Sequence, residues 1–162
     1  MENGNTMRYV IFDLDATVID SSHRQITKSD GSLDLAAWKK NSTYDAVMRD
    51  SLLPLARHWK TIQEKKNVFI AVCTARFMSD ADFDFLKFRG LKADQIMSRA
   101  FFDHRPDHLM KRTKILAFMQ KHKITNPSKI TFYDDNQNVL EMLNVLGVKA
   151  KDSIKINQEL SA

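Results

Sequence analysis

The chain reads Tyr9-Val10-Ile11-Phe12-Asp13-Leu14-Asp15-Ala16-Thr17 near its start, so that four apolar or aromatic residues run directly into an acidic pair. Such a continuous run is typical of a strand buried on both faces, as in a parallel sheet. Ligands of open α/β sheets bind at the carboxyl ends of the strands, where Asp13 and Asp15 would lie. Two carboxylates so close repel each other unless a cation or a proton compensates them. Hard oxygen ligands suit Mg²⁺, although an Asp-rich turn is the simpler interpretation.

Length and composition indicate one folded domain, residues 1–162, with a small flap or cap insertion at about residues 16–43. Charged residues make up 28% of the chain, and the formal net charge of +5 permits a polyanionic partner without requiring one. The single cysteine, Cys73, excludes an internal disulfide and lies in an apolar run, which indicates a buried side chain. A reducing compartment fits this composition, so we expect a cytoplasmic protein.

Several function classes are not expected. The polar segment Met1–Thr6 does not resemble a secretory signal, and no stretch approaches the roughly 20 apolar residues of a membrane span. The phosphate-loop pattern G-x-x-x-x-G-K-[ST] does not occur, which argues against kinase chemistry of that type.

Strands are predicted to alternate with helices, which predicts an α/β protein with a parallel sheet flanked by helices. The predicted strands are residues 8–13, 68–73, a short segment within 95–102, 129–133, and an edge strand at 148–150 or around 154–156. The predicted helices are a turn at 33–38, residues 44–65 interrupted by Pro54, 79–90, 106–122 and 136–147. Phe83 and Leu86 are expected to pack inward, and residues 157–162 are expected to fray.

Polar groups follow three of these strands: Asp13 and Asp15, Thr74 and Arg76, and Asp134 and Asp135. Because the carboxyl ends of parallel strands share one edge, these groups are expected to converge. Lys111 shares a helix face with Ile115 and Phe118, so it is expected to point toward the packed side.

This set resembles the four motifs of the haloacid dehalogenase superfamily of phosphotransferases: Asp13-x-Asp15-x-Thr17, Thr74, Lys111 and Asp134-Asp135. The resemblance covers about residues 8–150 and implies that superfamily's Rossmann-like fold. Ala16 stands where glycine is common. Within the superfamily, the run Asp103-x-Arg105-x-Asp107-x-x-x-Lys111 resembles the 3′-phosphatase half of phage-type polynucleotide kinase/phosphatases. Asn136 stands where an arginine often follows the acidic pair.

The resemblance also implies a mechanism. Asp13 would attack phosphorus and form an aspartyl-phosphate, and Asp15 would act as general acid and then as general base. Mg²⁺ would be held by Asp13, the backbone carbonyl of Asp15, and Asp134 or Asp135. Thr74 and Lys111 would stabilise the transferring group, with Thr17 also at the substrate. Arg76 and Arg105 would bind the substrate phosphate, although salt bridges with Asp103 or Asp107 are an equal alternative.

The favoured prediction is therefore a Mg²⁺-dependent hydrolase that removes 3′-phosphates from nucleic-acid ends in repair. One alternative is a phosphatase for nucleoside monophosphates or another small phosphoester, and another is a phosphatase-fold binding module without catalysis. The sequence leaves open the natural substrate, DNA or RNA, the oligomeric state, the pathway, and which of Asp134 and Asp135 binds the metal.

Overall fold

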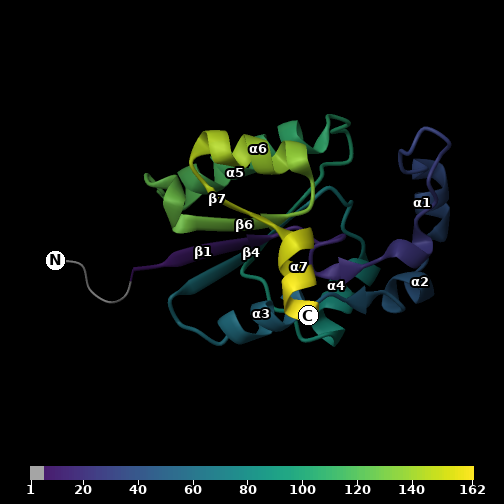
Figure 1. Cartoon of the computed structure of the whole chain (residues 1–162), viewed down its shortest axis with the longest axis horizontal. Helices are drawn as coiled ribbons and strands as arrows, with labels where there is room; N and C mark the ends of the chain where they lie inside the picture. Colours follow the sequence, from purple (N-terminus) through teal and green to yellow (C-terminus); the bar gives the residue numbers. More distant parts are fainter. Residues whose placement is uncertain (1–5) are drawn as a thin grey trace.

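The computed structural model describes residues 6–162, and the predicted absence of a signal sequence rests mainly on residues outside that range. Five strands form one sheet in the order β5-β4-β1-β6-β7, and every neighbouring pair is parallel (Figure 1). Their bounds are Arg8–Phe12 for β1, Val68–Thr74 for β4, Gln95–Ser98 for β5, Ile130–Asp134 for β6 and Lys149–Asp152 for β7. The predicted parallel sheet is confirmed.

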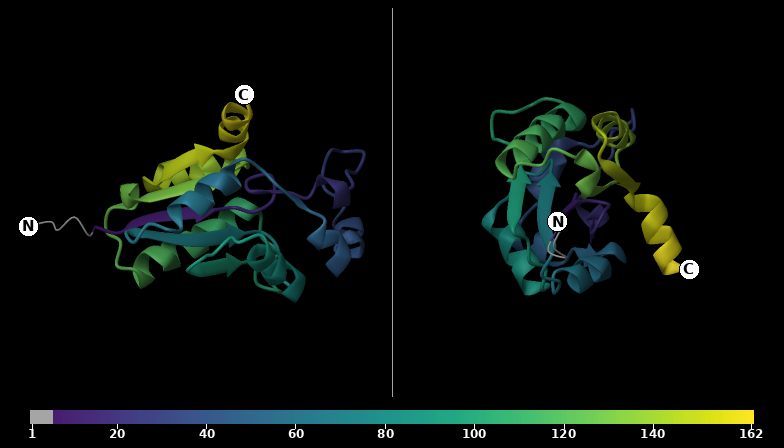
Figure 2. Two further views of the ribbon diagram at one scale, coloured as in Figure 1. Left: turned by 90° about the horizontal axis from the view of Figure 1, so that it is seen from below. Right: turned by 90° about the vertical axis from the view of Figure 1, so that its left-hand side faces the viewer.

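Helices cover both faces of this sheet. Helices α3 (Leu55–Ile62) and α4 (Asp80–Phe88) pack on one face, and α5 (Asp107–Lys121) and α6 (Gln137–Leu146) pack on the other (Figures 1 and 2). The short 3₁₀ helix η2 (Pro127–Lys129) precedes β6. Gly147 ends α6 with a φ of +85°, a left-handed conformation in which glycine carries no Cβ penalty.

The alternation of side chains along β1 divides the core in two. Val10 and Phe12 face the α3 and α4 side, whereas Ile11 faces the α5 and α6 side. The Phe12 ring stacks on Trp59 at 4.9 Å and on Tyr133 at 5.2 Å between ring centroids. This packing fixes the end of β1, and therefore the position of the residues that follow it.

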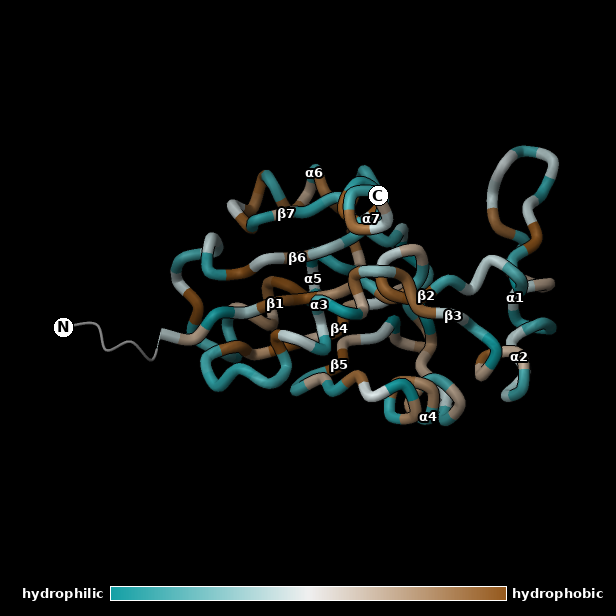
Figure 3. The backbone as a smooth tube through the Cα atoms, turned by 60° about the horizontal axis from the view of Figure 1, so that its bottom comes forward, coloured by the Kyte–Doolittle hydropathy of each residue, from teal (hydrophilic) through white to brown (hydrophobic). Residues whose placement is uncertain are grey.

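A flap extends beyond the carboxyl end of the sheet, at the opposite end of the molecule from the N-terminus (Figures 1 and 3). It comprises β2 (Ile19–Asp20), the 3₁₀ helix η1 (Ser22–Arg24), α1 (Leu35–Asn41), α2 (Tyr44–Met48) and β3 (Ser51–Leu52). Strands β2 and β3 pair antiparallel, and α2 packs against α4. The flap was predicted as residues 16–43, and the division of the chain into domains stays a prediction.

The prediction of one apolar stripe along a helix from 44 to 65 was wrong in part. The chain forms α2, then β3, then α3, so Leu52 lies in a strand rather than on a helix. Pro54 immediately precedes α3, where a missing N–H costs nothing. The helix-like spacing of apolar residues therefore runs across two helices and a strand.

The predicted fraying of residues 157–162 was also wrong, because α7 (Ser153–Ser161) is formed there. Asn157 is buried; its Oδ1 accepts the Leu55 N–H at 2.9 Å, and its Nδ2 donates to the Thr17 carbonyl at 2.9 Å. These two bonds tie α7 to α3 and to the loop after β1. Phe83, predicted to point inward, is 46% exposed, and Phe85 takes the inward position.

Within residues 6–162, none of the helices combines the length and apolar character that crossing a membrane requires.

Candidate active site

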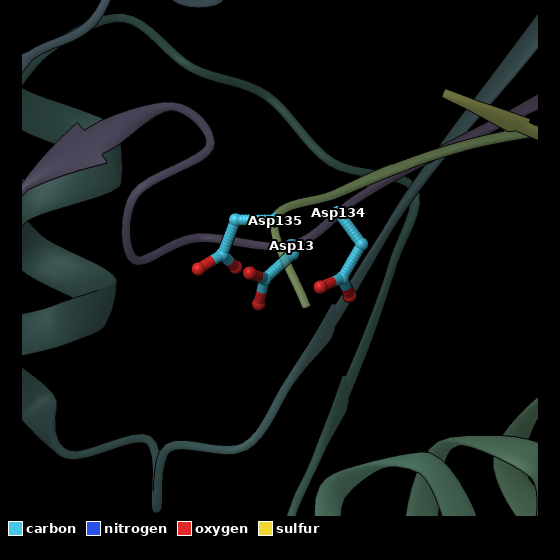
Figure 4. A group of neighbouring side chains, drawn as sticks. All are labelled: Asp13, Asp134 and Asp135. Carbon is cyan, nitrogen blue, oxygen red and sulfur yellow. The ribbon is translucent and has the colours of Figure 1, made fainter. Parts of the chain in front are cut away.

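Three carboxylates converge where β1 and β6 end. Asp13 directly follows β1, Asp134 is the last residue of β6, and Asp135 follows it. One oxygen from each lies within 4.8 Å of the other two. Figure 4 shows the three side chains grouped at this point. Because β1 and β6 are neighbouring parallel strands, the predicted meeting of these side chains is confirmed.

Lys111 reaches the same point from α5. Its Nζ lies 3.1 Å from Asp13 Oδ1 and 2.7 Å from Asp134 Oδ2, and the residue is 2% exposed. Burial by itself lowers the pKa of this ammonium, but the two carboxylates outweigh burial and hold the pKa above its ordinary value. The prediction that Lys111 points to the packed side is confirmed, and the side chain stays charged.

Burial has the largest effect on the pKa values of Asp13 and Asp134. It raises the pKa of Asp13 well above its ordinary value, against the opposing charge of Lys111 and with the support of Asp134 and Asp135. Burial also raises the pKa of Asp134, again partly offset by Lys111. A charged Asp13 is therefore costly here unless more positive charge is nearby.

The donor set fits a divalent metal ion. Asp13, Asp134 and Asp135 carry three carboxylates against the one ammonium of Lys111, which leaves two negative charges uncompensated within this group. Carboxylate oxygens are the ligands that Mg²⁺ prefers. The Asp15 side chain is not part of the group, and only its backbone carbonyl was assigned to the metal.

Asp15 is held by an arginine. Arg76 Nε lies 2.7 Å from Asp15 Oδ2 and Arg76 Nη2 lies 2.6 Å from Oδ1, while Ser21 Oγ donates to Oδ1 at 2.5 Å. Burial raises the pKa of Asp15, but Arg76 and Ser21 outweigh it and lower the pKa below its ordinary value. The Asp15 side chain remains 27% exposed and can be reached from the adjacent cavity.

Arg76, predicted to bind the substrate phosphate, makes salt bridges within the protein, and its phosphate-binding role stays a prediction. It is buried, and beside Asp15 it donates to Asp82 at 2.7 Å and lies 3.5 Å from Asp50. Asp82 is in turn part of the capping box of α4 with Ser79, which fixes its position. The donors of Arg76 are therefore directed to carboxylates of the protein.

Arg105 makes a salt bridge with Asp103, which is one of the two partners named in the alternative interpretation. Its Nε and Nη2 donate to the two oxygens of Asp103 at 3.0 and 2.8 Å, and its Nη1 donates to Thr113. Arg105 is exposed and lines the cavity above the acidic group, so a phosphate could compete for it. Asp107, the other predicted partner, pairs with Arg99 at 2.6 Å.

Two threonines complete the predicted set. Thr17 is buried; its hydroxyl lies 3.3 Å from Asp13 Oδ2 and 3.0 Å from Ser153 Oγ on α7. Thr74 is buried at the end of β4, and its hydroxyl accepts the Arg76 N–H at 3.1 Å. Ala16, directly after Asp15, has a φ of +60°, a conformation that suits the glycine common at this place.

Sequence reasoning missed a second charged group that supports the first. Arg24 of the flap is 2% exposed and binds Asp50 with two hydrogen bonds, Nε–Oδ1 at 3.0 Å and Nη2–Oδ2 at 2.7 Å. Asp50 also accepts from His23 at 2.7 Å. Because these partners are 26 and 27 residues apart and follow no motif, no local pattern could have identified them.

The whole chain, residues 1–162, matches the family described as bacteriophage T5 5′-deoxynucleotidase. The chain belongs to this family. A curated relative, the 5′-deoxynucleotidase of Escherichia phage T5, is 30% identical over 174 aligned positions, which cover 95% of this chain and 70% of the relative.

Solved structures of haloacid dehalogenase-like proteins share the fold of this family member. A subfamily IA hydrolase from Geobacter sulfurreducens superposes with a TM-score of 0.65 at 14% identity, over 98% of both chains. A haloacid dehalogenase-like protein from Streptococcus pneumoniae gives 0.62 at 12%, over 94% of this chain and 91% of the other. The predicted haloacid dehalogenase-like fold is confirmed.

A chain of the Pnkp1/Rnl/Hen1 RNA repair complex superposes with a TM-score of 0.57 at 18% identity, over 94% of this chain. This family member spans only 44% of that longer chain, and the likeness concerns the fold.

Proposed function

We propose that this protein is a Mg²⁺-dependent phosphatase that hydrolyses the 5′-phosphate of deoxynucleoside monophosphates. The observation that carries the proposal is the match of the entire chain to a family whose phage T5 member is named 5′-deoxynucleotidase. The acidic group at the ends of β1 and β6 supplies the reactive groups such a reaction needs. The predicted cytoplasmic location stays a prediction.

In this proposal Asp13 is the nucleophile. A bond forms between its carboxylate oxygen and phosphorus while the bond from phosphorus to the 5′-oxygen breaks, and water then hydrolyses the aspartyl-phosphate. Lys111, 3.1 Å from Asp13, neutralises charge that develops on the phosphoryl oxygens. Thr17 orients Asp13 through its hydroxyl, and Thr74 holds the loop that carries Arg76.

Asp15 is proposed to move protons in both steps. It gives a proton to the departing 5′-oxygen and later takes one from the attacking water. The contact with Arg76 favours the ionised form, which suits the second step, so the first step requires that this contact loosens when substrate enters.

A bound Mg²⁺ would let an anionic nucleophile approach an anionic phosphate, and Asp13, Asp134 and Asp135 would hold it together with the Asp15 backbone carbonyl. We therefore expect EDTA to abolish phosphate release, because three carboxylates beside one ammonium would repel the substrate. Excess Mg²⁺ should restore the full rate. Full activity in EDTA, at a chelator concentration that strips a known Mg²⁺ enzyme in parallel, would show that this group holds no essential metal.

Asp15→Asn should slow turnover at least about a hundredfold, because the amide cannot transfer a proton. The loss should be smaller for p-nitrophenyl phosphate, whose leaving group needs no proton, and the phosphoenzyme should then accumulate. The measurement is the ratio of kcat values for the two substrates, wild type against variant. An equal loss on both substrates, without accumulation, would contradict the general acid role.

A second candidate is removal of 3′-phosphates from polynucleotide ends, favoured by one observation. Arg105, within the run Asp103-x-Arg105-x-Asp107-x-x-x-Lys111, is exposed at the cavity above the acidic group. The net charge of +5 agrees with a polyanionic substrate, although it is modest.

The test is a paired kinetic comparison of 5′-deoxynucleoside monophosphates, their 3′ isomers and 3′-phosphorylated oligonucleotides at two salt concentrations. We expect the 5′-monophosphates to give the highest kcat/KM, with little effect of salt. A higher value for the oligonucleotide, falling as salt is added, would replace the first candidate by the second, because released counterions weaken polynucleotide binding at high salt.

A further inference from the structure

The acidic group lies in a cavity of about 650 Å³ that apolar side chains also line. Cavities of this size hold ligands considerably larger than a phosphate. The same cavity that contains Asp13 and Lys111 is lined by Leu33, Leu35 and Trp38 of the flap and by Phe77 of the loop after β4. One cavity therefore contains both the acidic group and a wall of apolar and aromatic side chains.

Two of the four side chains in this apolar wall are exposed to solvent. Phe77 is 50% exposed and Leu35 is 69% exposed. Phe77 contacts the Phe101 ring at 6.2 Å between centroids, which supports it from the side. Exposed apolar surface inside a cavity is typical of a ligand-binding site.

Trp38 is held in place by the side chain of Arg24. The guanidinium carbon of Arg24 lies 4.3 Å from the centroid of the Trp38 ring, and Arg24 is itself fixed by Asp50 and by Ser42 at 2.7 Å. A ring braced in this way loses little conformational freedom when a ligand binds. The flap thus presents a preorganised aromatic surface to the cavity.

We propose that Trp38 and Phe77, with Leu33 and Leu35, form the subsite for the nucleobase of a mononucleotide whose phosphate lies at Asp13. This inference rests on the proposed function and adds to it the residues that recognise the base. Every base has a π-face that stacks on aromatic side chains, so such a wall accepts several bases with little selectivity. The polar side chains of Gln25 and His104, which line the same cavity, suit the edge of a heteroaromatic ring better than an alkyl chain.

The experiment compares deoxynucleoside 5′-monophosphates with deoxyribose 5-phosphate, which is the same phosphoester without a base. In the wild type we expect kcat/KM to be at least about tenfold higher for the nucleotide, mainly through KM. Phe77→Ala and Trp38→Ala should lose most of that preference, because kcat/KM should fall much more for the nucleotide than for deoxyribose 5-phosphate. Phe77→Tyr should retain it, because the ring remains.

Phe88→Ala is the matched control, since Phe88 is 76% exposed on α4 and does not line the cavity. A second readout does not depend on turnover of the nucleotide: free deoxynucleoside should compete with deoxyribose 5-phosphate in the wild type and in Phe88→Ala, but about tenfold more weakly in Phe77→Ala. Thermal melting of each variant checks that it is folded.

The outcomes separate the two proposals. If the wild type prefers the nucleotide but Phe77→Ala and Trp38→Ala lose equally on both substrates, the base subsite is overturned and the proposed function stands. If the wild type shows no preference and no inhibition by deoxynucleoside, the subsite is overturned together with the nucleotide specificity. Selective loss of the preference in both variants supports the subsite.

Discussion

Asp13→Asn is expected to reduce phosphate release by at least about a thousandfold, because an amide cannot accept the phosphoryl group. The fold should survive, since the amide matches the carboxylate in size and Lys111 keeps Asp134 as a partner at 2.7 Å. The melting temperature should not fall, because burial and the neighbouring carboxylates oppose the charge of Asp13 in the native state. The measurements are single-turnover phosphate release and thermal melting.

Asp20→Asn is the control for that experiment. Asp20 lies in the same connection after β1, but its carboxylate accepts from the Ser22 N–H and hydroxyl, outside the acidic group. The Asp20→Asn variant should release phosphate at the wild-type rate. Residual activity in Asp13→Asn above a few per cent, in protein free of contaminating phosphatase, would refute the nucleophile assignment.

Asp50→Ala is expected to lower the free energy of unfolding by roughly 3–5 kcal/mol, because it leaves a buried arginine without its carboxylate. Arg24 is 2% exposed and Asp50 is fully buried, so water cannot replace the lost partner in the folded state. For a protein of this length that loss corresponds to a fall in melting temperature of roughly 6–20 °C.

The control here is Asp84→Ala, which removes an exposed carboxylate that accepts from the Tyr44 hydroxyl at 3.0 Å. Its melting temperature should be close to that of the wild type, since exposed polar contacts contribute little. Equal stability of Asp50→Ala and the wild type in urea denaturation would mean that the Arg24–Asp50 pair does not support the flap.

The parts of the fold that follow from local pattern were predicted well. A buried apolar run identifies β1, β4 and β6, and parallel strands bring their ends to one edge, so Asp13, Asp134 and Lys111 could be expected to meet. The sequence predicted a break at Pro54 but not the strand β3 before it. A two-residue strand has no periodicity that a sequence pattern could reveal.

The parts that depend on distant partners were not predicted. The side chain of Arg76 pairs with Asp15, 61 residues away, and Asn157 of α7 binds the loop after β1 across 140 residues. The run from Asp103 to Lys111 favoured a 3′-phosphate substrate, whereas the family match favours a 5′-deoxynucleotide. Short motifs identify the chemistry of such a site, but the substrate is selected by side chains that only the fold brings together.

The most direct test of the central claim is a trapping experiment with a 5′-³²P-labelled deoxynucleoside monophosphate. The Asp15→Asn variant and the wild type are mixed with substrate and quenched in acid, and the protein-bound ³²P is counted. Tritiated borohydride then reduces the acyl phosphate, which releases the labelled phosphate and leaves a tritiated homoserine that peptide mapping locates. The account predicts tritium on residue 13, within the tryptic peptide of residues 9–24. Turnover of the nucleotide by the wild type with no label on either protein, or label on another residue, would contradict it.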